Sequence, residues 1–199
     1  RIPILLGPRG EFSEGALNIS SKKKKLFLKL YIFLGLNKNI TFQASSTYEY
    51  SDIKKLFNNN KIFIAEDIGS QDYSKNLSIK NSSFIKLVCL SRISPMKNIL
   101  YALEILDKTN CEVVFDIYGP LEDMLYWEEC NKIIDVLPEN ITVNYKGVLK
   151  PIDVVETLST YDLFFMPTRG ENYGHVIAEA FCAGLPVLIA NTTPWRDLV

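Results

Sequence analysis

The sequence predicts an α/β fold in which helices alternate with the strands of a parallel sheet. Short apolar runs rich in branched and aromatic residues, such as FIKLVCL at 84–90, recur along the chain. Such runs are typical of strands buried on both faces. Helix-length segments separate them, and this alternation indicates βαβ units. Two helix signals fit the same order, since Ser46 and Glu49 form a capping box and Gly184 ends the last helix.

The first 67 residues predict a partial α/β segment. We expect strands at 2–6, 40–44 and 61–65, with a helix at 22–36 between the first two. The capping box at Ser46 begins a second helix, which reaches Phe57.

A polar stretch from Glu66 to Ser83 is rich in Ser and Asn and predicts an interdomain linker at 68–83. The chain is thereby divided into a first domain at 1–67 and a second at 84–199. The chain does not begin with methionine, and it is shorter than a complete two-domain protein of this kind. We therefore expect a fragment.

The sequence of the second domain predicts five strands, at 84–90, 112–118, 141–145, 163–166 and 186–190. One helix is expected within 99–109, and Pro151 can open another at its first turn. The last helix is expected from about Tyr173 to Ala183.

Two glutamates eight residues apart, Glu171 and Glu179, bracket the start of this last helix. Pro167 ends a strand, a turn follows, and the helix then presents free N–H groups and the positive end of its dipole. Those donors suit a pyrophosphate, and the carboxylate of Glu179 suits sugar hydroxyls. The pattern therefore indicates a nucleotide-sugar. The alternative is that both glutamates only favour the helix dipole or cap the first turn.

Arg92 and Lys97 follow the strand at 84–90, at the edge where open α/β sheets bind ligands. A planar guanidinium and a mobile ammonium both neutralise phosphate. The sequence has no D-x-D pair to hold a divalent metal, so we expect fixed cations in place of a metal. The alternative is that both are ordinary solvated loop residues.

These motifs occur in a recognisable order. R-x4-K after a strand, Y-K-G-V-L at 145–149, the E-x7-E segment and EAFCAGLPVLIA at 179–190 together resemble family-four retaining glycosyltransferases. PRGEFSEGAL at 8–17 and ITFQASSTYE at 40–49 resemble the end of their first domain. The resemblance implies the GT-B architecture, with a Rossmann-like parallel sheet flanked by helices in the C-terminal domain.

The resemblance also implies a role for each matching residue. Arg92 and Lys97 match the basic pair that holds the pyrophosphate and stabilises the leaving nucleoside diphosphate, and Glu171 matches a glutamate near the donor sugar. Glu179 matches the glutamate that binds ribose hydroxyls. The other donor-binding positions are Gly119, at a strand end, Val148 and Leu149, near the base, and Asn172, Tyr173, Gly174 and His175, in the turn.

The chain departs from the family pattern at two places. Ser91 replaces the glycine usual before the arginine, and TTPWRDL at 192–198 replaces a Gly-Gly-x-x-Glu turn. The first change is tolerable, whereas the second affects the sugar-facing loop.

Composition excludes several other classes of function. The net charge of −1 gives no reason to expect a nucleic-acid partner. The four cysteines, at 89, 111, 130 and 182, have no C-x-x-C spacing and indicate neither disulfide nor metal site. No cofactor or metal is expected, and without a signal peptide the expected location is cytoplasmic.

The 22–36 helix carries Lys22 to Lys25 beside a leucine-rich and aromatic face. Its ordinary interpretation is a domain helix with solvated lysines. The alternative is a peripheral contact with an anionic membrane, at the inner face where lipid-linked acceptors reside.

The expected activity is transfer of a sugar, with retention, from a nucleotide diphosphate-sugar to a glycan or lipid-linked acceptor in polysaccharide or lipopolysaccharide synthesis. The fragment alone should be inactive, because first-domain residues are missing. A sugar-nucleotide epimerase, a phosphorylase and a non-catalytic nucleotide-sugar binding module are the alternatives.

Overall fold

The computed structural model describes residues 2–18, 21–67, 69, 73–74 and 83–196. Packing divides the chain into two units. The first unit contains Arg1–Ile68, Arg169–Tyr173 and Asn191–Val199, and the second contains Gly69–Thr168 and Gly174–Ala190. The predicted linker at 68–83 lies largely outside the described residues, and the domain limits 1–67 and 84–199 stay a prediction.

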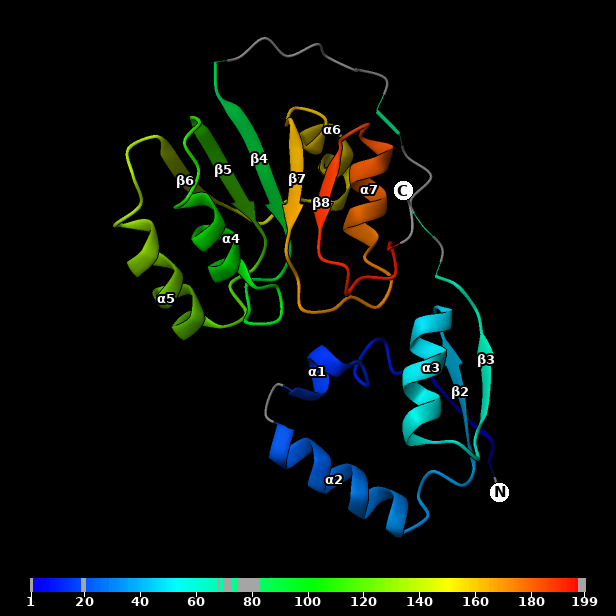
Figure 1. Cartoon of the computed structure of the whole chain (residues 1–199). Coiled ribbons are helices and arrows are strands. Elements are labelled where there is room, and N and C mark those ends of the chain that lie inside the picture. The colour runs from blue at the N-terminus through cyan, green and yellow to red at the C-terminus, as the bar shows by residue number, and fades with distance from the viewer. Residues whose placement is uncertain (1, 19–20, 68, 70–72, 75–82, 197–199) are drawn as a thin grey trace. The chain divides into compact units, whose positions relative to one another are not determined.

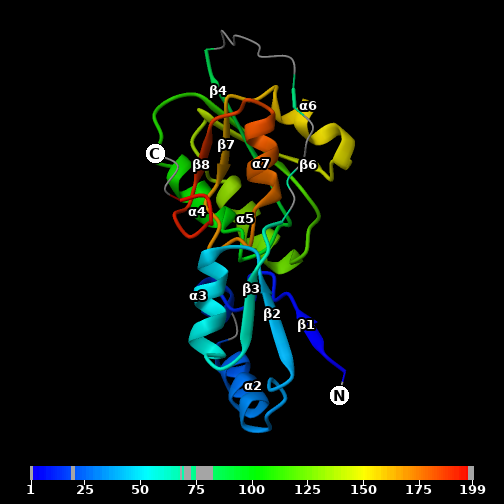
Figure 2. The ribbon, with the colours of Figure 1, turned by 90° about the vertical axis from the view of Figure 1, so that its right-hand side faces the viewer.

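The first unit contains a three-stranded parallel sheet in the order β1-β2-β3. Its strands are β1 (Ile4–Leu6), β2 (Ile40–Ala44) and β3 (Lys61–Ile64). Its helices are α1 (Glu14–Asn18), α2 (Ser21–Phe33) and α3 (Thr47–Leu56). Figure 2 shows α3 against β2 and β3, where Ile53 packs with Phe42 and Phe57 in the core.

The predicted capping box is half correct. Ser46 accepts a hydrogen bond from the backbone N–H of Glu49, as an N-cap serine should. The Glu49 carboxylate does not return the bond to Ser46. It accepts instead from the backbone N–H groups of Gly10 and Ser45, each at 2.7 Å. The second hydrogen bond of the predicted box, from the backbone N–H of Ser46 to the Glu49 carboxylate, was therefore wrong. The carboxylate binds neighbouring chain segments instead.

The second unit contains a five-stranded sheet in which every pairing is parallel (Figure 1). The order is β6-β5-β4-β7-β8. The strands are β4 (Ile85–Leu90), β5 (Val113–Tyr118), β6 (Ile141–Gly147), β7 (Leu163–Met166) and β8 (Val187–Ile189). Counted within the unit, this order is 3-2-1-4-5, which is that of a doubly wound Rossmann-like sheet.

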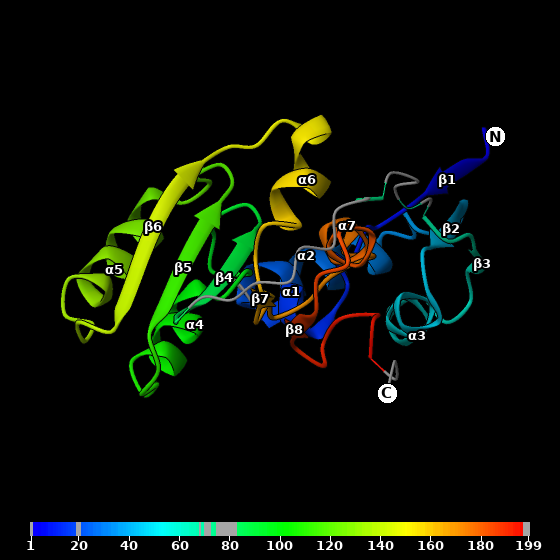
Figure 3. The same cartoon turned by 90° about the horizontal axis from the view of Figure 1, so that it is seen from above.

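Helices cover both faces of this sheet. They are α4 (Ile99–Leu106), α5 (Met124–Ile134), α6 (Val154–Leu158), preceded by a 3₁₀ turn η1 (Pro151–Asp153), and α7 (His175–Cys182). Seen from above in Figure 3, α4 and α5 lie on one face and α6 and α7 on the other. The predicted α/β fold, a parallel sheet flanked by helices, is confirmed.

The centre of this unit is apolar. Val88, Phe115, Phe164 and Ile177 are fully buried, which fits strands covered on both sides. Asp116 on β5 is the buried charge, and it is satisfied because it accepts from Asn144 and from the hydroxyl of Tyr161 at 2.8 Å each. Burial raises the pKa of the Tyr161 phenol, so it stays a donor.

Several predicted element ends were displaced by a few residues. The helix predicted to 36 ends at Phe33, and the one predicted within 99–109 ends at Leu106. The last helix begins at His175 rather than Tyr173, since Gly174 takes the left-handed conformation, with φ 79°, and ends the preceding turn. Among the described helices, none combines the length and apolar character that crossing a bilayer requires.

Candidate functional site

The carboxyl ends of the parallel strands in the second unit lie at one edge of the sheet. Arg92 follows β4, Gly119 follows β5, Val148 follows β6, and Pro167 follows β7. Between β4 and β7 the chain order reverses, and ligands of doubly wound sheets bind at this switch point. The fold therefore brings these four strand ends, which the sequence placed in separate segments, to one edge.

The two loops that flank the switch point are bonded to each other. The side chain of Asn98 donates to the carbonyl oxygen of Pro167 at 3.1 Å. From the other loop, the Thr168 hydroxyl donates to the carbonyl oxygen of Met96 at 3.2 Å. These two bonds cross in opposite directions and hold the β4 loop beside the β7 loop.

Arg92 lies on an extension of the β4–β5 pairing. Backbone hydrogen bonds run from Ser91 to Tyr118 (3.0 Å) and from Ile93 to Pro120 (2.9 Å), so the ladder continues past the named strands. The side chain of Arg92 is exposed and forms an ion pair with Glu122, which sequence reasoning did not single out.

Lys97 is half-buried and precedes Asn98, the N-cap residue of α4. Its backbone N–H donates to Ser94 at 2.9 Å, which closes the turn between β4 and the helix. Arg92 and Lys97 thus belong to one short loop at the switch point, and both bring positive charge to it.

Gly119 is the point where the loops after β4 and β6 approach β5. Its φ is +132°, and a side-chain Cβ there would lie 1.8 Å from the carbonyl oxygen of Ser91. Its N–H donates to the carbonyl oxygen of Gly147 at 2.8 Å. The next residues, Val148 and Leu149, are exposed and half-buried respectively. Only glycine fits at position 119, because any side chain there would collide with the backbone of Ser91.

The first turn of α7 carries His175, which is exposed, and Glu179 lies one turn later and half-buried. Burial raises the pKa of the Glu179 carboxyl, and the nearby His175 offsets part of that rise. A half-buried carboxylate one turn into a helix accepts hydrogen bonds from hydroxyl groups, while the N–H groups at the helix start attract anions.

Glu171, Asn172 and Tyr173 pack with the first unit. The Asn172 amide donates to Asp67 at 3.3 Å, and its oxygen lies 2.7 Å from the hydroxyl of Ser45. Tyr173 accepts from the indole N–H of Trp195 through its carbonyl oxygen. The side chain of Asn172 therefore anchors its own segment.

The first unit also contains a pocket of about 330 Å³. Its lining is mainly polar and includes Asp52, Lys55, Arg169 and Arg196. The guanidinium of Arg196 lies 3.8 Å above the ring of Tyr48. Such a lining offers hydrogen bonds to a hydroxylated ligand.

Two residues near the predicted cations were missed, Glu122 and Asn98. Their partners lie 30 and 69 positions away in the chain. Only the register between strands brings these pairs together, so no local pattern could have identified them.

The chain resembles known proteins in sequence. A model of the family described as glycosyl transferases group 1 matches residues 71–199, more than half of the chain. The sulfoquinovosyl transferase SQD2 of Arabidopsis thaliana is 26% identical over 114 residues, which cover 57% of this chain and 21% of that protein.

Solved structures share the fold. Anabaena HepE, crystallised with UDP and glucose, superposes with a TM-score of 0.73 at 18% identity, over 99% of this chain and 55% of HepE. WaaG, a glycosyltransferase of lipopolysaccharide biosynthesis, gives 0.62 at 17% identity, over 79% of this chain and 46% of WaaG. The chain thus spans about a fifth of SQD2 and about half of HepE.

Proposed function

Since the chain belongs to the group 1 glycosyl transferases, with a GT-B fold, we propose that the whole protein transfers a sugar from a nucleotide diphosphate-sugar to an acceptor. The second unit holds the donor. One observation carries this proposal: the loop with Arg92 and Lys97 is bonded to the loop before α7 at the switch point. In this proposal the cations and the start of α7 hold the nucleotide at the switch point, where doubly wound sheets bind such ligands.

In this proposal Arg92 and Lys97 neutralise the diphosphate. Cleavage of the sugar–phosphate bond leaves additional negative charge on the departing oxygen, and fixed cations stabilise that charge. Because two cations already do so, we expect no divalent metal to be required.

The remaining residues recognise the two ends of the donor. Gly174, His175 and the first turn of α7 direct N–H groups at the phosphates, and Glu179 accepts from the ribose hydroxyls. Gly119 lies at a neighbouring strand end near the nucleotide, and Val148 and Leu149 cradle the base. Glu171, with Asn172 and Tyr173, lies in the segment that faces the donor sugar in the family that the sequence resembles.

Retention of configuration follows from the same resemblance. No described side chain is placed as an evident nucleophile, so a front-face displacement assisted by the leaving phosphate is the expected route. The acceptor is a glycan or a lipid-linked glycan, and the pathway one of polysaccharide or lipopolysaccharide synthesis; WaaG belongs to such a pathway.

A peripheral membrane contact through α2 remains part of this proposal. Leu26, Phe27, Leu30 and Phe33 are exposed by 54% or more, beside the lysines at 22–25. Apolar and cationic groups on one helix suit an anionic membrane surface, where a lipid-linked acceptor would be found.

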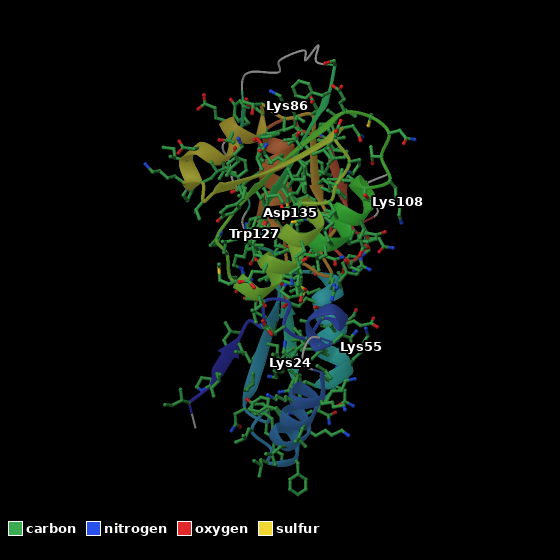
Figure 4. The ribbon with its side chains drawn as sticks, turned by 90° about the vertical axis from the view of Figure 1, so that its left-hand side faces the viewer. Lys24, Lys55, Lys86, Lys108, Trp127 and Asp135 are labelled. Atoms are coloured by element: carbon green, nitrogen blue, oxygen red, sulfur yellow. The ribbon has the colours of Figure 1, made fainter. Side chains whose placement is uncertain are left out.

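The test uses the full-length protein, with UDP as the first nucleotide because HepE was crystallised with it. Lys97→Ala should weaken UDP binding about tenfold or more, since it removes a charge-assisted bond. Lys108→Ala is the matched control. Lys108, labelled in Figure 4, follows the C-terminal end of α4, whereas Lys97 precedes its N-terminal end.

Turnover with candidate acceptors completes the test. Acceptor-dependent release of nucleoside diphosphate supports transfer, whereas consumption of donor without an acceptor would indicate an epimerase instead. If Lys97→Ala and Lys108→Ala bind UDP equally well, Lys97 does not hold the diphosphate and the proposed site is wrong.

A further inference from the structure

We infer that Glu122 competes with the diphosphate for Arg92. The diphosphate must therefore displace the Glu122 carboxylate in order to bind. The inference rests on the proposed function, because it assumes that Arg92 receives the diphosphate. Glu122 lies in the loop after β5, and its carboxylate pairs with the guanidinium of Arg92. No sequence motif of the donor site includes Glu122.

The backbone holds the two residues close to each other, diagonally across the ladder. The parallel register of β4 and β5 ends at Leu90 and Tyr118 and resumes in a bridge between Ile93 and Leu121. The carbonyl oxygen of Ile93 also accepts from the N–H groups of Glu122 (3.2 Å) and Asp123 (3.1 Å). Arg92 and Glu122 are thus neighbours across a bonded ladder, rather than two side chains that meet by chance.

Exposure makes the pair weak enough to open. The side chain of Arg92 is 63% exposed and that of Glu122 is 43% exposed. Exposed ion pairs contribute little to stability because water and salt screen them. A diphosphate brings more negative charge than one carboxylate, so it outcompetes Glu122 for the guanidinium.

This competition affects both binding and release. While Glu122 is paired with Arg92, part of the attraction of Arg92 for phosphate is already satisfied, and a carboxylate near the diphosphate repels it. When nucleoside diphosphate has formed, Glu122 can return to Arg92 and favour its departure. Glu122 is therefore a positioning residue that lowers product affinity.

The experiment measures binding of inorganic pyrophosphate to the full-length protein by calorimetry. Pyrophosphate contains the charged part of the ligand and is independent of the base. Glu122→Gln should tighten binding about two- to fivefold, the range that an exposed pair allows. The gain should shrink as ionic strength rises from about 0.01 M to about 0.15 M.

Two further variants test whether the tighter binding results from loss of the ion pair with Arg92. Glu128→Gln removes the same charge from an exposed position on α5 and should leave binding unchanged. In an Arg92→Ala background, Glu122→Gln should have no effect, since the partner is gone. Melting curves confirm that each variant is folded.

The outcomes separate the inference from the proposed function. If Arg92→Ala weakens binding but Glu122→Gln does not tighten it, the competitor role is wrong and the diphosphate site stands. An equal gain with Glu128→Gln, or with Arg92 absent, also overturns it. If Arg92→Ala leaves pyrophosphate affinity unchanged, the role of Arg92 in the proposed function fails as well.

Discussion

The side-chain amide of Asn98 donates to the carbonyl oxygen of Pro167 at 3.1 Å, although Asn98 occupies the N-cap position of α4. Asparagine at this position commonly caps its own helix. Here φ is 58°, no side-chain cap is formed, and the amide turns to the β7 loop. The switch point is thus held together by a residue that local rules would assign to α4 alone.

Asn98→Asp tests this bond with little change of shape. Aspartate also tolerates a left-handed backbone, but its ionised carboxylate cannot donate to Pro167. We expect the free energy of unfolding to fall by about 1–3 kcal/mol at neutral pH, measured by urea titration. The loss should shrink at acidic pH, where the protonated acid can donate to Pro167. No loss at neutral pH would contradict the assigned bond.

Because Asn98 does not cap α4, another group serves its N-terminus. The backbone N–H of Leu100 donates to the hydroxyl of Tyr126 on α5 at 3.0 Å. Tyr126→Phe leaves that N–H without this partner, and we expect a loss of about 1–2 kcal/mol by urea titration. Tyr101→Phe on α4 is the control, since Tyr101 is 50% exposed. Equal losses in the two variants would refute the capping role.

The strands were the most predictable part of the chain. The strands at 40–44 and 163–166 agree with the structure at both ends. LFFM at 163–166 is apolar throughout, as in a strand covered on both faces, and ITFQA at 40–44 alternates buried and half-buried residues. The start of α7 was missed by two residues, because the left-handed conformation of Gly174 is a property of the backbone and has no periodic signal.

The candidate site was predictable only in part. Sequence reasoning found Arg92 and Lys97 because each follows an apolar strand and carries a charge of the right sign. It missed Glu122, whose relevance depends on the register of β4 against β5, and Asn98, whose partner follows β7. Contacts between distant strand ends arise from tertiary pairing, which a single sequence does not specify locally.

Two glycines at strand ends allow the cost of a steric clash to be distinguished from the cost of an unfavourable backbone conformation. A Cβ at Gly119 would lie 1.8 Å from the oxygen of Ser91, whereas one at Gly147 would meet nothing within 4 Å. Both have positive φ. We expect Gly147→Ala to cost about 1–2 kcal/mol for backbone strain alone and Gly119→Ala more than about 3 kcal/mol. Urea midpoints measure both, and equal costs would contradict the close approach.

Glu179 links the stability of the second unit to pH. Burial raises the pKa of its carboxyl, which means that the folded protein binds the proton more readily than the unfolded chain does. The ionised carboxylate therefore destabilises the fold above that pKa, and the penalty declines as pH falls from the raised pKa to the ordinary pKa of a glutamate. Its partial exposure limits the size of the effect.

Glu179→Gln removes the penalty together with the hydroxyl acceptor. We expect the melting temperature at neutral pH to rise by up to about 4 °C, with a gain that shrinks below the raised pKa and is absent once pH lies below the ordinary pKa of a glutamate. UDP affinity should fall, because an amide accepts less strongly from ribose hydroxyls than a carboxylate does. Melting curves at several pH values and UDP titrations measure both effects, with Glu104→Gln, an exposed position on α4, as control. A gain that persists unchanged at low pH would contradict a desolvated carboxylate, because only its ionised form is penalised.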